Sequence, residues 1–374
     1  MSKSFSSLLK KRPMWFSTIG EYSDVIIGSM ARVVRNLAGH SFPGWSTKEG
    51  RREVAELLLP HIMQLPGNKT QAFCAEMSDL SYAQRRVLLE RKQISQCLAA
   101  RQDGCHIIIN GKQDTTFMIN EEEHLVMHLY STQSDHTPLL RRAEKITREL
   151  ETNLNFAKSY SGEYLTSIPM EAGTGIQLYT ILHLPALNTA GMMPQIHRSL
   201  EKLMLHISPF FSAMGDDVAG LFALYTPTIP VGAEDEISEH LRSTVLTLAQ
   251  RELDVRECLD HESQPVALLP DLIGRAYGLL QYAHKLEYKE FLNALSMLRL
   301  GAVMGYVCHE GLTLEKYIAY LAQYYTLAGP YHMQEAHGLS ETAALNFRVG
   351  MARHILMHSE LDTSLSPTES LYFV

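Results

Sequence analysis

The stretch from His106 to Tyr130, HIIINGKQDTTFMINEEEHLVMHLY, constrains the fold of this chain more than any other segment. Its first half holds two β-branched and aromatic runs, with Asn110-Gly111 between them. Because Asn-Gly favours the positive φ angles of a tight hairpin turn, the pattern predicts two antiparallel strands. A third, mostly apolar strand is predicted from His124 to Tyr130.

Three adjacent glutamates, Glu121, Glu122 and Glu123, follow the second of these strands. Their charges repel one another, and a connection that only had to join two strands would have no need for them. A run of like charges is nevertheless often a solvated turn. Two interpretations therefore stay open: an acidic turn in solvent, and a functional site.

The length and composition favour two domains, or one large domain with an appendage. The chain has 374 residues, and 45% of them are hydrophobic, which is enough for a sizeable core. The net charge of -8 and the lack of a broad basic face argue against nucleic-acid binding. No long apolar run follows the basic N-terminal residues, so neither a signal peptide nor a membrane span is expected.

The five cysteines are scattered, and none stands in a Cys-x-x-Cys pair: Cys74, Cys97, Cys105, Cys258 and Cys308. Their odd number and spacing argue against a disulfide framework and against a structural zinc site. Reduced thiols in a cytoplasmic protein are therefore expected, with no metal held by the protein alone.

The first hundred residues predict a lead-in, a strand and two helices. Residues 1–20 form a basic, amphipathic lead-in with Trp15 and Phe16 as anchors. A strand begins at Asp24 and becomes cationic at Arg32 and Arg35, which could face one site or lie on a surface. Helical spacing is found over residues 48–63 and 80–100. The second helix is expected to expose its charged face: Arg85, Arg86, Glu90, Arg91 and Lys92.

The rest of the chain changes from mixed structure to mainly helix. Thr137-Pro138 is typical of a helix start. Gly173-Thr174-Gly175 could hold a phosphate through backbone N–H groups, or could be a plain loop. The predicted divisions are a lead-in (1–20), a strand-containing body (21–256), a helical domain (257–359) and a loose tail (360–374).

Three segments together resemble the motifs of one known family. Residues 24–37 are similar to Ser-x-Arg-x-Arg-x-x-Arg-Asn-Leu, and residues 120–125 to Asn-Glu-Glu-Asp-His-Leu. Residues 166–176 are similar to Thr-Ser-Cys-Pro-Thr-Asn-x-Gly-Thr-Gly-Ile. These are motifs of the ATP:guanido phosphotransferases, or phosphagen kinases. The blocks that begin at His183, Arg275 and Leu298 resemble its bacterial protein-arginine kinase branch, of McsB type.

The resemblance covers nearly the whole chain and implies an α+β fold. It implies a large antiparallel sheet flanked by helices, as in the phosphagen-kinase or glutamine-synthetase-like catalytic domain, followed by a helical C-terminal domain. ATP and Mg²⁺ are the implied cofactors if the chain is active. A homodimer is also implied.

The resemblance assigns roles to a few residues. Glu122 matches the glutamate that binds the substrate guanidinium, and Asp217 falls near an acidic position of the catalytic site. Arg32 and Gly173-Thr174-Gly175 match nucleotide-binding positions. Four other positions hold no arginine where the family has one: Met30, Val126, Gln177 and Pro209. Ile168 stands where the family has a cysteine.

The missing arginines decide the expected chemistry. Phosphoryl transfer depends on neutralising phosphate charge, and one arginine finger can contribute about 10³–10⁵ in rate. Four lost charged hydrogen bonds remove roughly 6 kcal/mol or more of phosphate binding. The nearby histidines, His106, His124 and His128, are expected to be ordinary, mostly neutral strand residues.

A second family motif is also incomplete. The Arg-Asp-x-x-Arg-Ala motif, which binds phosphoarginine in the McsB-type branch, matches Ala344-Leu-Asn-Phe-Arg348-Val. Only Arg348 remains of its charged residues, and a surface salt bridge is its expected role.

Two functional hypotheses follow. In the first, the chain is a degenerate member, a pseudokinase that binds partners of bacterial stress proteolysis. By resemblance these would be a zinc-binding activator or a Clp-type ATPase. In the alternative, it is an active ATP-dependent protein-arginine kinase with a rebuilt phosphate site.

Overall fold

The protein is described by a computed structural model over residues 4–10, 22–69, 71–101, 103–213, 216–260, 268–309 and 311–361. The predicted anchors Trp15 and Phe16 lie outside these residues. Eight of the described strands form one antiparallel sheet in the order β2-β3-β4-β5-β1-β6-β8-β7. In chain order the strands are β1 Ile26–Arg35, β2 Phe73–Glu76, β3 His106–Ile109, β4 Thr115–Ile119, β5 Leu125–Ser131, β6 Ile176–His183, β7 His206–Ala213 and β8 Asp216–Tyr225.

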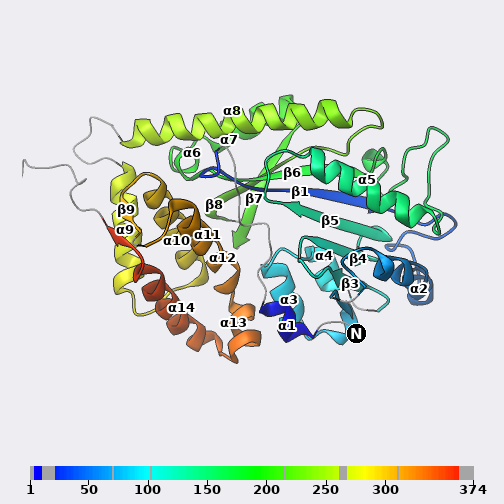
Figure 1. The fold of residues 1–374 in the computed structure, drawn as a ribbon, viewed down its shortest axis with the longest axis horizontal. Helices are drawn as coiled ribbons and strands as arrows, with labels where there is room; N and C mark the ends of the chain where they lie inside the picture. The colour runs from blue at the N-terminus through cyan, green and yellow to red at the C-terminus, as the bar shows by residue number, and fades with distance from the viewer. Residues whose placement is uncertain are drawn as a thin grey trace, which may run out of the picture.

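Helices cover one face of this sheet and lie over both ends of the other (Figure 1). In the first part of the chain they are α1 Phe5–Leu9, α2 Lys48–Gln64, α3 Tyr82–Glu90, α4 Gln96–Ala100, α5 Thr137–Glu151, α6 Pro185–Thr189, α7 Met193–Lys202 and α8 Glu234–Asp260. The C-terminal part adds α9 Leu268–Tyr282, α10 Tyr288–Val303, α11 Leu314–Ala322, α12 Tyr324–Leu327, α13 Pro330–His337 and α14 Glu341–Leu356. The predicted fold class, a large antiparallel sheet followed by a helical domain, is confirmed.

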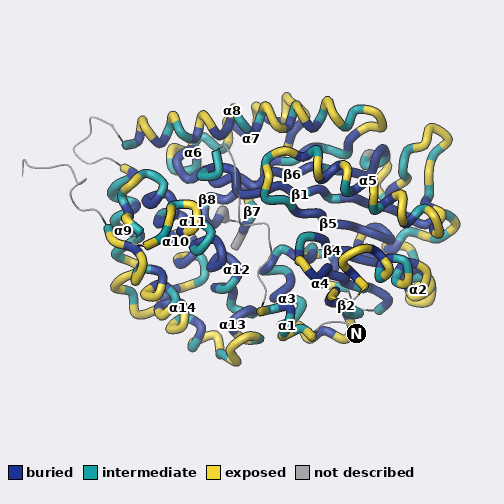
Figure 2. The backbone as a smooth tube through the Cα atoms, viewed as in Figure 1, coloured by how far each residue is buried: buried dark blue, intermediate teal, exposed yellow. Residues whose placement is uncertain are grey.

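Three buried clusters account for the arrangement, and the central strands of the sheet are mostly buried (Figure 2). The largest lies between one face of the sheet and helices α2, α5, α7 and α8. On the opposite face, a second cluster packs β2–β5 against α1, α3 and α4. A third packs β6–β8 against the C-terminal helices. The middle of that opposite face lies between two separate cores.

The predicted hairpin is present, but its turn is not the predicted one. β3 and β4 pair from His106↔Ile119 to Ile109↔Thr116. The connection spans residues 110–114, and the positive φ angle is at Gln113 (60°), not at Asn110-Gly111. The Asn110 side chain accepts hydrogen bonds from the N–H groups of Asp114 and Thr115, which holds the longer loop. A side-chain bond therefore replaces the predicted tight turn.

The predicted helix over residues 80–100 is broken into α3 and α4, and its charged face is not wholly exposed. The chain turns after Glu90, where Lys92 has a φ of 56°. Arg91 is 1% exposed, and its guanidinium donates to the side chains of Gln93 and Gln113. The turn directs the Arg91 side chain into the fold, where the amide oxygens of Gln93 and Gln113 accept its hydrogen bonds.

Two predictions for the C-terminal part of the chain, a surface position for Arg348 and a loose tail from residue 360, are wrong. Arg348 is buried, not on the surface, and it donates to the carbonyl oxygens of Ala328 and Leu286. It is therefore a structural donor that holds two loops together. Glu360 and Leu361, which were expected to begin the tail, form β10 (Glu360–Leu361) with β9 (Val307–Cys308). Residues 362–374 lie outside the described part of the chain.

One carboxylate joins the N-terminal helices to the helical domain. Glu90, at the end of α3, accepts hydrogen bonds from the N–H groups of Tyr331 and His332 at the start of α13. Helix N-termini favour an anionic partner, because their first N–H groups have no partner within the helix. Gly329 lets the two elements approach, since a Cβ built there would lie 2.2 Å from Glu90 Oε2. Figure 1 shows α13 beside α3, although the two helices are far apart in the sequence.

Two of the three glutamates in the turn between β4 and β5 are buried and hydrogen-bonded within the fold. Glu123 is buried and accepts hydrogen bonds from Asn36 Nδ2 (2.7 Å) and from the Ser167 N–H (2.9 Å) and hydroxyl (2.8 Å). Glu121 is also buried and accepts from the Ser95 hydroxyl. Only Glu122 between them is exposed, with 51% of its side chain accessible. The three glutamates are therefore neither a plain solvated turn nor a single site.

Replacing Gly329 by alanine should loosen the contact between α3 and α13. The added Cβ would displace the Glu90 carboxylate from two backbone N–H groups, so we expect a loss of about 1–3 kcal/mol in the free energy of unfolding. Gly350→Ala is the matched control, because Gly350 lies in α14 with open space around it. That variant should be neutral or slightly stabilising. Urea unfolding of both variants checks this, and equal stabilities would contradict it.

Glu123 and Glu122 should differ sharply when truncated. Glu123→Ala leaves one N–H of the buried Asn36 amide and the Ser167 N–H without their acceptor, so about 3 kcal/mol should be lost. Glu122→Ala removes an exposed carboxylate from the same turn and should change the unfolding free energy by no more than about 0.5 kcal/mol. Denaturant unfolding measures both. A large effect of Glu122→Ala would show that the turn is held differently.

Candidate active site

A polar row crosses the sheet between the two cores of its second face. Arg32 on β1 pairs with His128 on β5 and with Gln177 on β6, so their side chains share one face. The neighbouring row on that face contains Met30, Tyr130 and Tyr179. Because strand pairing fixes this register, Arg32 stands at the centre of the face.

Arg32 is surrounded by acceptors from three segments of the chain. Its Nη1 donates to Gln177 Oε1 (3.1 Å) and lies 3.5 Å from Glu171 Oε2. Its Nη2 lies 3.8 Å from Glu122 Oε2. Two carboxylates and one amide oxygen therefore face a single guanidinium.

The acidic side chains outweigh the charge of Arg32. One positive charge stands against the two negative charges of Glu122 and Glu171. Partial burial, and then the charge of Glu121, raise the pKa of Glu122, with a further upward contribution from Glu171. Crowded carboxylates disfavour one another's ionised form, so this end of the row favours a cation over a further anion.

The histidine of the row supplies no charge to offset this. Burial, and then the positive charge of Arg32, lower the pKa of His128 to about 3. His124 is buried and held by the N–H of Leu37 and the carbonyl oxygen of Ser41. Burial also lowers the pKa of His106. The imidazoles of all three are therefore neutral near pH 7.

Arg35 lies on the other face of β1, away from Arg32. Its Nη1 donates to the carbonyl oxygens of Val34 and Thr174, and its guanidinium lies 3.5 Å from the centre of the Tyr164 ring. Residues three apart on a strand point to opposite faces. The two arginines therefore share no site, and Arg35 does not lie on the surface.

The Gly-Thr-Gly turn is packed tightly against β1 and the segment after β8. A Cβ at Gly175 (φ 63°) would lie 2.7 Å from the Val34 carbonyl oxygen, and one at Gly173 2.9 Å from that of Ile229. The Thr174 N–H and hydroxyl both donate to the Ile229 carbonyl. Glycine is thus required for close packing here. The role of these three residues in nucleotide binding stays a prediction.

The remaining predicted positions lie in different surroundings. Met30 packs at the edge of the C-terminal core, and Val126 is fully buried in the core of α3 and α4. Ile168 is exposed. Pro209 lies on the edge strand β7, where the register shifts before Phe211. Asp217 on β8 pairs with Ser212 on β7, and the side chain of Asp217 lies outside the described part.

The sequence motifs gave no functional role to two charged residues of this region, Glu171 and Lys92. Glu171 occupies the place of asparagine in the family motif quoted above, and that substitution was the available signal. Lys92 extends its ammonium group to 5.0 and 4.8 Å from the ring centres of Phe210 and Phe211, next to Pro209. Burial lowers the pKa of Lys92 to about 8.

These residues do not fit a triphosphate. Arg32, the arginine that matches a nucleotide-binding position of the family motif, already faces two carboxylates, and phosphate would have to displace them. In the described residues, no cluster of three or more histidine, cysteine or acidic side chains is arranged to hold a metal ion. No helix among them is long and apolar enough to cross a membrane.

Known proteins resemble this chain along most of its length. Residues 53–255 match the family described as ATP:guanido phosphotransferase, C-terminal catalytic domain, and residues 267–364 match the protein-arginine kinase McsB C-terminal domain. The protein-arginine kinase of Moorella thermoacetica is 30% identical over 303 residues, which cover 79% of this chain and 85% of the relative. That of Halothermothrix orenii is 26% identical over 324 residues, or 87% and 90%.

Solved structures agree on the fold. The crystal structure of lombricine kinase has a TM-score of 0.53 at 16% identity, over 69% of this chain and 72% of that one. The duplicated taurocyamine kinase of Schistosoma mansoni, with bound transition state analog components, has a TM-score of 0.56 at 17% identity, over 90% and 52%. The sequence matches cover more than half of the chain. The chain therefore belongs to the ATP:guanido phosphotransferase family.

Proposed function

We propose that this chain is a degenerate protein-arginine-kinase-like protein, a pseudokinase, that binds partner proteins without transferring phosphate. The observation that carries the proposal is the pairing of Arg32 with both Glu122 and Glu171. Phosphoryl transfer needs an excess of positive charge around the phosphates, and here the retained arginine is outnumbered by carboxylates.

The acidic half of the site suits a different ligand, the side chain of arginine. Glu122 is exposed and stands at the position that binds the guanidinium in the family, and Glu171 adds a second carboxylate. A carboxylate can accept two parallel N–H bonds from a guanidinium. The chain would thus keep the guanidinium-binding part of the site and lose the phosphate-binding part.

The proposed partners are proteins of bacterial stress proteolysis in the cytoplasm. By family resemblance they are a zinc-binding activator or a Clp-type ATPase, and a homodimer is the proposed assembly. An exposed arginine of such a partner would dock against Glu122. ATP and Mg²⁺ would then have no role in this chain.

Lys92 favours the alternative, an active kinase with a rebuilt phosphate site. Its ammonium group is not the nitrogen of any ion pair between described residues, and it lies beside the β7 segment where a family arginine is replaced by Pro209. A desolvated lysine is a possible phosphate ligand, although it acts as a point charge and not as a fork.

Incubation with Mg-ATP and a protein substrate, followed by mass spectrometry for phosphoarginine, tests the proposal directly. We expect no phosphoarginine above the level of a sample without enzyme, while an active protein-arginine kinase assayed in parallel gives a clear signal. Phosphoarginine that forms with the wild type and disappears in Glu122→Ala would overturn the pseudokinase proposal.

Replacing Glu171 by asparagine should strengthen nucleotide binding. The change removes the carboxylate 3.5 Å from Arg32 and restores the residue of the family motif. We expect Mg-ADP to bind about tenfold more tightly than to the wild type, a gain of about 1.4 kcal/mol by titration calorimetry. Glu257→Gln, an equal charge change on an exposed position of α8, should have no effect.

The same titrations distinguish the alternative. Micromolar binding of Mg-ADP by the wild type, lost in Lys92→Met, would contradict the pseudokinase proposal and support a rebuilt phosphate site. Weak binding that is unchanged in Lys92→Met supports the proposal.

A further inference from the structure

A cavity of about 660 Å³ lies away from the candidate active site, at the end of the sheet formed by β3 and β4. It is enclosed by the segment after α2, the β3–β4 connection and the middle of α5. Phe117 lines it and pairs with Met127, which pairs with Val33. This row alternates with the row of Arg32, so the cavity and the polar row lie on opposite faces of the sheet.

The inner wall of the cavity combines apolar side chains with one ion pair whose two charges cancel. Leu65 and Phe117 are buried, and Ile146 covers them from α5. Arg142 Nη2 donates to Asp114 Oδ1 (3.0 Å), and its Nη1 donates to the Tyr130 carbonyl oxygen (3.2 Å). Asn110 Nδ2 donates to the same carboxylate (2.6 Å). Arg142 and Asp114 therefore neutralise each other in the wall.

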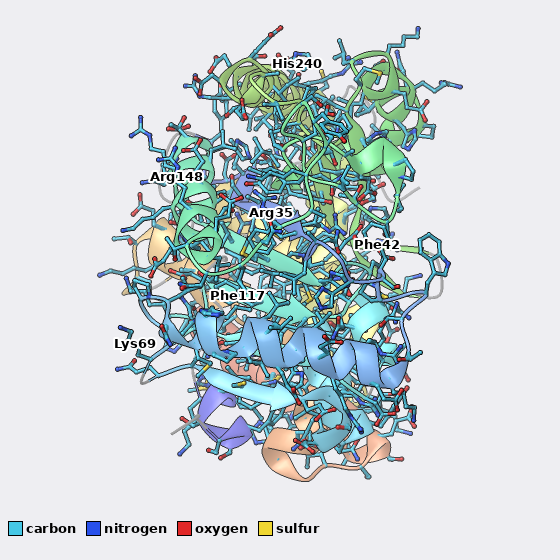
Figure 3. The ribbon with its side chains drawn as sticks, turned by 90° about the vertical axis from the view of Figure 1, so that its right-hand side faces the viewer. Arg35, Phe42, Lys69, Phe117, Arg148 and His240 are labelled. Atoms are coloured by element: carbon cyan, nitrogen blue, oxygen red, sulfur yellow. The ribbon has the colours of Figure 1, made fainter. Side chains whose placement is uncertain are left out.

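The rim, by contrast, carries an excess of positive charge. Lys69, Lys112 and Lys145 line the cavity, one from each of the three enclosing segments. None of these lysines forms an ion pair with another described residue, and Glu149 is the remaining acidic side chain of the lining. Three positive charges against one negative charge leave an excess of two. Figure 3 shows Lys69 and Phe117 near the same end of α2.

This excess stands out because the chain as a whole has a net charge of -8. Like charges around one cavity repel one another, and an anion bound there would relieve that repulsion. The volume is within the range of small-molecule sites, about 300–1,000 Å³. Lysine ammonium groups bind phosphate as compact point charges.

We propose that this cavity binds a phosphorylated small molecule of about mononucleotide size. The phosphate would lie among Lys69, Lys112 and Lys145, and the organic part would lie toward Ile146 and Phe117. This site is separate from the polar row at Arg32, and its occupation does not depend on whether the chain transfers phosphate.

Titration calorimetry with AMP, GMP and inorganic pyrophosphate, in 50 mM salt, tests the proposal on the full chain. We expect at least one mononucleotide to bind with a measurable affinity. In Lys112→Gln/Lys145→Gln that affinity should fall at least tenfold. Lys202→Gln/Lys316→Gln removes the same charge from exposed positions of α7 and α11 and should bind like the wild type.

Two further results decide the location of the ligand. Arg32→Ala should leave the affinity unchanged, because Arg32 lies on the opposite face of the sheet. Hydrogen exchange of residues 110–115 and 142–149 should slow on binding. The proposal is overturned if none of the three probes binds at 5 mM, or if binding is lost in Arg32→Ala and kept in the double lysine variant.

Discussion

The pairing of β1 with β5 on one side and β6 on the other is the constraint on which the rest of the structure depends. Seven residue pairs join β1 to β5, and the register places Arg32 between His128 and Gln177. A slip of one residue would turn Arg32 into the large core and expose Val33. The two smaller cores then form on either side of this row and leave it as the polar part of the face.

The same register explains how the fold survives the loss of the arginines. Val126 is fully buried where the family has a charged side chain, and Met30 packs against the C-terminal core. An apolar side chain at such a position adds packing and carries no desolvation cost. The stability of the sheet and the charge of the site are thus separable, so a fold of this family can be kept while the charge of the site varies.

The sequence predicted elements well where the signal was local and poorly where it depended on the surroundings. The β3–β4 pair, β5 and α2 follow from apolar periodicity. The β3–β4 turn differs because the Asn110 side chain holds a longer connection than its dipeptide suggests. Arg91, Arg35 and Arg348 are all buried, although charged side chains suggest solvent. Each finds carbonyl or amide oxygens from distant segments, which periodicity does not reveal.

For this protein the sequence by itself determined the strand pattern, the family motifs and the absence of arginine at four of their positions. Only the tertiary structure decided that Glu122 and Glu171 face Arg32, that Glu121 and Glu123 are buried supports, and that three lysines share a cavity. These facts depend on contacts between residues far apart in the chain, such as Arg32 and Glu171. Local propensity fixes backbone geometry, whereas the charge around a group is set by whatever the fold brings within a few ångströms of it.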